Sequence, residues 1–126
     1  MKLELPLSEI EDYIKTCYNI NLSIKYIETN KLEINYLFAI GITIKEVLDY
    51  SIIFGYELNW AANMLAKGAK FMTNNNIDKN ILNWDTLKKE VNLNLVHIPA
   101  LNDFLKLFRI SSCTIENNVL FLELSK

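Results

Sequence analysis

The sequence predicts an α+β fold, in which helices pack against the apolar face of a bent, mostly antiparallel sheet. Two patterns lead to this class. Apolar and polar residues alternate over long segments, as in half-buried strands, and three other segments have the i, i+3, i+4 spacing of amphipathic helices. The chain has 126 residues and contains no linker-like or low-complexity tract, so we expect a single domain over residues 1–126.

The first helix is expected to begin at a capping box. Ser8 and Glu11 have the S-x-x-E spacing in which each side chain satisfies a backbone N–H at the start of a helix. Residues 1–5, ahead of this helix, are expected to form a short strand. The apolar residues of the helix follow at helical spacing and predict one stripe: Ile10, Tyr13, Ile14 and Cys17.

The longest regular pattern is an alternation with a period of two. It predicts a strand over residues 18–26 and a turn at 28–30, and it continues from 32 to 58, where 13 of the 14 even-numbered residues are apolar. Because a slip of one residue would turn every side chain to the opposite face, this parity predicts strands that face one common core. Gly41 is expected to mark a bend or bulge between two strands, and Gly55 a second kink.

Two further helices are expected in the second half of the chain. One covers about residues 59–73, and a short one covers about 99–108 and opens at Pro99. Residues 77–90 are compatible with a short helix or with a strand at 81–84. The remaining segments are a strand at 91–97 and a closing β-hairpin with strands at 109–115 and 119–125.

Composition and motif content exclude several classes of function. A formal net charge of -2 with a single arginine gives no concentrated basic surface, so nucleic acid is not an expected partner. No apolar run approaches the roughly 20 residues of a membrane-spanning helix, and acidic residues interrupt the N-terminus where a secretory signal would be apolar. We therefore expect a cytoplasmic protein. Residues 60–89 combine lysines with aromatic side chains, which suits contact with a membrane surface, but a helix packed on the sheet is the favoured interpretation.

The chain offers little catalytic chemistry. Cys17 and Cys113 are expected to be buried free thiols, and two cysteines with one histidine cannot form the usual structural zinc site. We expect no metal and no cofactor, and we assign no catalytic residue. A less favoured hypothesis is an enzyme that uses His97, the single histidine, together with Glu46 or Asp49.

Glu46 is the one polar residue at an even position between 32 and 58. An inward carboxylate would anchor a polar ligand head, whereas a bulge at residues 45–46 would leave it in solvent, and the bulge is the favoured interpretation. Tyrosines of the same parity are typical of a cavity for a small apolar ligand, although core packing explains them more simply. The candidate ligand-binding residues are Glu46, Tyr36, Tyr50, Tyr56, Trp60 and Met64.

These observations favour a binding module without catalytic activity, whose apolar groove holds a lipid-like or other hydrophobic ligand. Residues 59–73 would cover the groove as a movable lid. At the level of architecture this arrangement resembles tubular lipid-binding domains, although no family motif is matched. The alternative is a structural or regulatory protein–protein interaction domain with a filled core. Such a domain would dock a partner, or a second copy in a homodimer, on a strand edge or on the lysine-rich helix.

Overall fold

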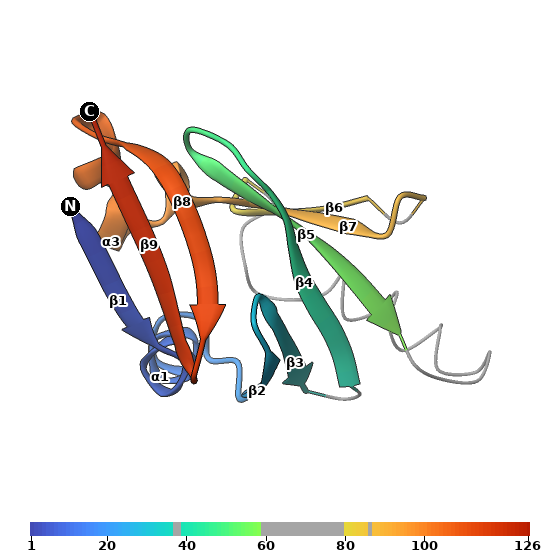
Figure 1. Cartoon of the computed structure of the whole chain (residues 1–126). Helices are drawn as coiled ribbons and strands as arrows, with labels where there is room; N and C mark the ends of the chain where they lie inside the picture. The colour runs from blue at the N-terminus through green and yellow to red at the C-terminus, as the bar shows by residue number, and fades with distance from the viewer. Residues whose placement is uncertain (37–38, 59–79, 86) are drawn as a thin grey trace.

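The computed structural model describes residues 1–36, 39–58, 80–85 and 87–126. The described strands form two antiparallel sheets, one with the strand order β1-β9-β8 and one with the order β2-β3-β4-β5-β7-β6 (Figure 1). The sheet-rich α+β class is confirmed, with two sheets where the sequence predicted one. The N-terminal helix and the smaller sheet comprise β1 (Lys2–Pro6), α1 (Leu7–Tyr18), β8 (Arg109–Glu116) and β9 (Val119–Ser125).

The larger sheet contains β2 (Ser23–Glu28), β3 (Lys31–Asn35), β4 (Ala39–Val47), β5 (Ser51–Leu58), β6 (Leu82–Asp85) and β7 (Glu90–Asn94). The chain then makes three short helical turns, η1 (Leu95–His97), α3 (Pro99–Asn102) and η2 (Phe104–Lys106). The short helix predicted over 99–108 is thus one α-helical turn that opens at Pro99, followed by a 3₁₀ turn. Of the two alternatives for 77–90, the strand is confirmed. The helix predicted over 59–73 lies outside the described residues, so the expectation of three helices is not confirmed.

The N-terminal helix is anchored by the closing hairpin rather than by a capping box. α1 begins at Leu7, whose N–H donates to the carbonyl oxygen of Asn118 at 2.9 Å. Ser8 therefore lies inside the first turn, and no described side chain caps the helix. The Glu11 carboxylate instead accepts a hydrogen bond from the Ile24 N–H of β2. The capping-box prediction was wrong, because β1 pairs with β9 up to the residue before Leu7 and the helix starts early.

This difference has a measurable consequence. Glu11→Ala is expected to lower the free energy of unfolding by about 1.5–3 kcal/mol, because the partly buried Ile24 N–H loses a charged acceptor. Glu11→Gln keeps an acceptor oxygen and is expected to lose less. Ser8→Ala is expected to change stability by less than about 0.5 kcal/mol. Urea unfolding of the three variants checks this, and a larger loss for Ser8→Ala than for Glu11→Ala would support the capping box after all.

The even-numbered alternation places side chains of β3, β4 and β5 in the core, as predicted. The β4–β5 register shifts by one residue between Ile44 and Glu46, which marks a bulge at Lys45. Beyond the bulge the inward residue of β4 is Val47, which lies opposite Ile52. In β5 the inward residues are again the even-numbered ones. Glu46 is exposed, so the bulge interpretation of this residue is confirmed.

The two glycines do not bend the chain where the sequence predicted. Gly41 lies inside β4 and Gly55 inside β5, and neither has a positive φ. The break between β3 and β4 comes instead after Asn35, where β3 ends. Gly55 permits a close approach of side chains, because a Cβ at this position would lie 3.0 Å from Cε of Lys45. Gly55 therefore provides space for the Lys45 side chain on the surface of the sheet.

Asparagines in the left-handed region end or turn several elements. α1 continues to Tyr18 and ends at Asn19 with φ 55°, so β2 begins later than the predicted strand. Asn30, with φ 62°, lies in the turn between β2 and β3. Asn117 and Asn118, with φ 50° and 67°, form the two-residue turn of the closing hairpin, where both central residues need positive φ. Asparagine tolerates this conformation better than other residues with a Cβ do.

The inward side chains of both sheets pack into one core. Its most deeply buried residues are Ile40, Ile52, Ile115, Leu122 and Leu124. The sheets also meet along the outer edge of β8. There the Asn30 N–H donates to the Ile115 carbonyl at 2.8 Å, and Asn30 Oδ1 accepts from the Ile115 N–H at 2.9 Å. Farther along the same edge, the Ile110 N–H donates to the Asp49 carbonyl at 2.7 Å. Turns of the larger sheet thus satisfy backbone groups of the smaller one.

The two cysteines have different environments. Both are free, but Cys17 is exposed, whereas Cys113 is buried on the inner face of β8. The expectation of two buried thiols is therefore wrong for Cys17, which lies in the last turns of α1. Burial raises the pKa of the Cys113 thiol from its ordinary value of 9.0 to about 12. Between pH 9 and about 12, this thiol therefore stays protonated in the folded protein, whereas it would ionise in the unfolded chain.

Stability is therefore expected to fall as the pH rises from about 9 towards 12. In this window the unfolded chain releases the Cys113 proton and the folded protein keeps it, which contributes a loss of about 1.4 kcal/mol per pH unit. Cys113→Ala lacks this component and should give a shallower decline than Cys17→Ala, which retains it. Urea unfolding at several pH values between 8 and 11 measures the two slopes, and equal slopes would show that the buried thiol does not contribute.

Candidate functional site

The tyrosines that the sequence grouped together lie apart in the structure. Tyr36 and Tyr50 flank opposite ends of β4, a strand of nine residues, so roughly 27 Å of extended chain separates them. Both are exposed. Tyr56 is buried, and its ring packs edge-on against Trp84 with the ring centroids 5.2 Å apart. Burial, with a smaller effect from the Asp85 charge, raises the pKa of the Tyr56 phenol above its ordinary value.

The other predicted residues do not join these tyrosines within the described part of the chain. Glu46 lies on the face of the sheet that points away from the core. Trp60 and Met64 lie outside the described residues. His97, the centre of the enzymatic hypothesis, is exposed at the end of η1.

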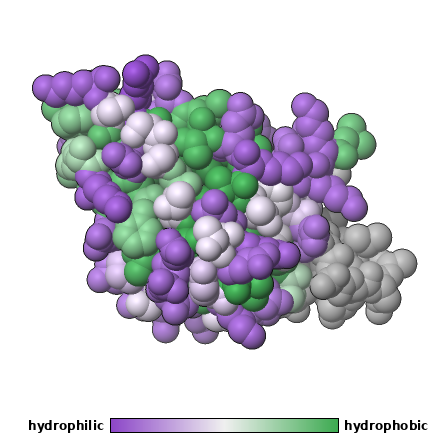
Figure 2. All heavy atoms as spheres, in the orientation of Figure 1, coloured by the Kyte–Doolittle hydropathy of each residue, from purple (hydrophilic) through white to green (hydrophobic). Residues whose placement is uncertain are grey.

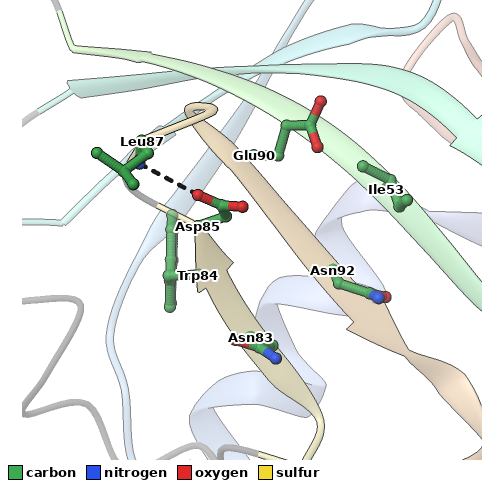
Figure 3. Close-up of a pocket in the computed structure, with 7 residues that line it drawn as sticks. All are labelled: Ile53, Asn83, Trp84, Asp85, Leu87, Glu90 and Asn92. Carbon is green, nitrogen blue, oxygen red and sulfur yellow. Dashed lines mark hydrogen bonds between the residues drawn. The ribbon is translucent and has the colours of Figure 1, made fainter.

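A pocket of about 400 Å³ lies elsewhere, on the outer face of β5, β7 and β6 (Figure 3). In Figure 3, Asp85 and Glu90 stand near the turn between β6 and β7, and Asn83 and Asn92 lie farther along the same strands. The lining combines two carboxylates and two amides with apolar side chains: Ile53, Asn83, Trp84, Asp85, Leu87, Glu90 and Asn92.

Strand register brings the polar side chains of this pocket together. In the antiparallel β6–β7 pair, Asn83 lies opposite Asn92, and Asp85 lies opposite Glu90. The two pairs are separated by two residues along each strand, so all four side chains lie on the same face. Ile53 of β5 is opposite Asn92 and adds an apolar side chain next to the amides. The site is therefore built on paired strands, which fix the positions of its side chains.

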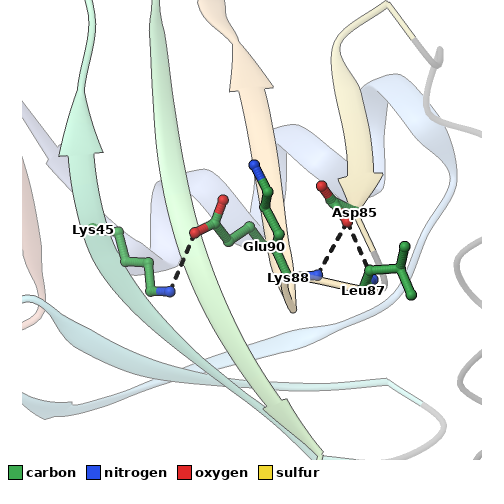
Figure 4. A network of polar contacts seen from close by, with 5 residues as sticks. All are labelled: Lys45, Asp85, Leu87, Lys88 and Glu90. Atoms are coloured by element: carbon green, nitrogen blue, oxygen red, sulfur yellow. Dashed lines mark hydrogen bonds and ion pairs between the residues drawn. The ribbon is translucent and has the colours of Figure 1, made fainter.

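An ion pair crosses the sheet beside the pocket (Figure 4). Lys45 Nζ of β4 lies 3.2 Å from Glu90 Oε2 of β7, although β5 runs between these strands. The crossing is possible because the β5 residue opposite Glu90 is Gly55, and its missing side chain leaves room for the Lys45 methylenes. The bulge at Lys45 and the glycine thus act together to deliver an ammonium group to the edge of the pocket.

The other carboxylate holds the turn between β6 and β7. Asp85 Oδ1 accepts hydrogen bonds from the N–H groups of Leu87 and Lys88, each at 3.1 Å (Figure 4). This arrangement is typical of aspartate in tight turns. Lys89 completes the turn with φ 54°. The turn leaves Leu87, which lines the pocket, 96% exposed.

The polar groups of the lining are two carboxylates, which accept hydrogen bonds, and two amides, which both donate and accept them. Asn92 Oδ1 is buried and has no hydrogen-bond partner among the described residues. Such unpaired buried acceptors are uncommon in folded proteins. No group of three or more His, Cys, Asp or Glu side chains in the described ranges could hold a metal ion. Among the described residues that line the pocket there is no Ser, Cys or His.

Sequence reasoning did not identify Asn83, Asp85, Glu90 and Asn92. The strand alternative at 81–84 could have identified them. If this strand pairs with the next one across a turn at 87–89, the polar residues at 83, 85, 90 and 92 share one face of the sheet. Without the register, these residues are indistinguishable from an ordinary solvated surface.

Exposed apolar side chains form a second surface feature. Leu48 and Tyr50 in the β4–β5 turn and Phe104 and Leu107 near η2 are at least 39% exposed. On the face shown in Figure 2, hydrophobic patches lie between hydrophilic side chains, so the surface there is mixed. The protein–protein interaction hypothesis, which placed a partner on a strand edge or on the lysine-rich helix, stays a prediction.

Comparisons with protein-family models, with curated proteins and with solved structures found no match to this chain. None of the helices in the described part of the chain is long and apolar enough to cross a membrane.

Proposed function

We propose that this chain is a ligand-binding domain, that its site is the β6–β7 pocket, and that its ligand is a small molecule rich in hydrogen-bond donors. The observation that carries this proposal is the convergence of Asn83, Asp85, Glu90 and Asn92 from two adjacent strands into one pocket. The volume of about 400 Å³ lies in the range of small-molecule sites. Apolar contact with Ile53 would supply part of the affinity.

The packing of the core favours this pocket over the apolar groove expected from the sequence. The inner faces of the two sheets bury their side chains against one another, and Ile40, Ile52 and Ile115 are at most 1% exposed. Their apolar surface therefore stabilises the fold. The hydrophobic-ligand hypothesis stays a prediction, because its lid falls on residues outside the described ranges.

The pocket is open and small, so dissociation constants of roughly 0.1–1 mM are expected for simple probes. Two-dimensional ¹H–¹⁵N NMR with sorbitol, butane-1,4-diol and butane-1,4-diamine tests the proposal. At least one probe should shift the amide signals of residues 82–93 in a saturable manner. Glu90→Gln replaces a charged acceptor with a neutral one, and Asn83→Ala removes a hydrogen-bond partner, so each should weaken its binding about ten-fold.

Glu46→Gln is the matched control. It removes an exposed carboxylate that lies on β4 opposite Ile53 but is not part of the described lining, so it should change the affinity much less than Glu90→Gln does. The proposal fails if no probe shifts these signals, or if Glu90→Gln and Glu46→Gln bind the probe equally well.

A further inference from the structure

We propose that the ligand of this pocket is a cation that carries an ammonium or guanidinium group. In the unliganded protein the Lys45 ammonium occupies part of the position that this group would take beside Glu90. This inference rests on the proposed function and names the chemical class of the ligand.

The first argument is the charge of the paired strands. Asp85 and Glu90 lie directly opposite each other, and like charges in this position destabilise a sheet unless a counter-charge is present. Lys45 is the ammonium that contacts Glu90 in the structure, so one positive charge serves two facing carboxylates. Lys88 and Lys89 lie in the turn beside these carboxylates, but neither forms an ion pair with them in the described part of the chain. Asp85 therefore has no cationic partner there, and a second cation would supply one.

The second argument is the donor and acceptor inventory. The carboxylates of Asp85 and Glu90 accept hydrogen bonds, and the exposed amide of Asn83 offers both an acceptor oxygen and an NH₂ donor. Ammonium and guanidinium groups donate several hydrogen bonds and accept none. A polyol also donates, but its hydroxyls carry no positive charge to pair with the two carboxylates.

The third argument is the position of Lys45. Its ammonium reaches Glu90 across Gly55, and the Lys45 side chain is 51% exposed. An exposed ion pair of this kind contributes little to stability. A ligand ammonium can therefore displace Lys45 from Glu90 at a small cost, and removal of Lys45 should favour the ligand.

Butane-1,4-diamine and butane-1,4-diol are matched probes, because they share a chain length and differ in charge. At low ionic strength the diamine is expected to shift the signals of residues 82–93 saturably, and the diol is expected to bind at least ten-fold more weakly. In Lys45→Met the diamine should bind about two- to five-fold more tightly. In Lys106→Met, which removes a lysine from another exposed ion pair, the affinity should stay within two-fold of the unmodified protein.

The outcomes separate the two proposals. If the diol binds at residues 82–93 as well as the diamine does, the pocket stands and the cation inference is overturned. If Lys45→Met binds the diamine no more tightly than Lys106→Met does, the role given to Lys45 is wrong. If neither probe nor sorbitol shifts these signals, the proposed function fails as well. Thermal unfolding of each variant confirms that both substitutions leave the protein folded.

Discussion

Replacing Ile42 with lysine is expected to remove more than about 4 kcal/mol of folding free energy, whereas the same change at Thr43 should cost less than about 0.5 kcal/mol. Ile42 is 5% exposed in the core, and Thr43 is exposed on the outer face of the same strand. A lysine at 42 would bury an uncompensated charge or force the two sheets apart. Since a domain of this size has roughly 5–15 kcal/mol of stability in total, much of the population would unfold in mild denaturant.

The bulge at Lys45 changes which residues of β4 point into the core: even-numbered residues do so before it, and the odd-numbered Val47 does so after it. Val47 is the inward residue after the register shift, and Glu46 points outward. Val47→Lys is therefore expected to cost about 1–3 kcal/mol, since Val47 is only half-buried, and Glu46→Lys should be nearly neutral.

Urea unfolding of the four lysine variants, followed by circular dichroism, tests the alternation and the bulge together. If Glu46→Lys were as destabilising as Ile42→Lys, the even parity would continue through position 46 and the bulge would be absent. If Thr43→Lys were as destabilising as Ile42→Lys, both faces of β4 would be buried.

The alternation could be read from the sequence because it depends on a local property. Even-numbered residues such as Ile40, Ile42 and Phe54 are apolar because the strands that carry them have one buried face, and a period of two needs no tertiary information. The bulge at Lys45 was predictable for the same reason, since Glu46 breaks the period. The closing hairpin was predictable from the paired asparagines between its strands.

Other features depend on contacts between distant segments. Leu7 starts α1 because Asn118, at the other end of the chain, accepts its N–H, and no local pattern around Ser8 contains that information. Gly55 was predicted to be a kink because a glycine within a strand usually marks one. Its role depends on Lys45, which crosses it from the neighbouring strand.

The pocket was missed for a related reason. Asp85 and Glu90 are five positions apart and look like ordinary surface residues in the sequence. Only the β6–β7 register places them opposite each other, and only the ion pair with Lys45 shows how part of their charge is balanced. A polar site on the solvent face of a sheet has no periodic signal of its own, because polar residues are expected there in any case.

Asn30 is expected to be the most sensitive turn residue in the described chain, because it joins the two sheets. Its N–H and Oδ1 satisfy the carbonyl and N–H of Ile115 on β8, and its carbonyl accepts the Ile44 N–H of β4 at 3.1 Å. Asn30→Ala leaves the partly buried Ile115 N–H without its acceptor, at a cost of about 1–3 kcal/mol. It also places alanine at φ 62°, which costs about 1 kcal/mol more.

Two matched variants separate these contributions to the loss of about 2–4 kcal/mol expected for Asn30→Ala. Asn30→Gly accepts the left-handed backbone and loses only the side-chain hydrogen bond, so it should be less destabilising than alanine. Asn118→Ala introduces the same backbone strain at φ 67° in an exposed turn and should cost about 1 kcal/mol. Urea unfolding curves give the three values. If Asn30→Ala costs no more than Asn118→Ala, the hydrogen bond from Ile115 does not hold the sheets together, and the shared core of β4 and β8 does so alone.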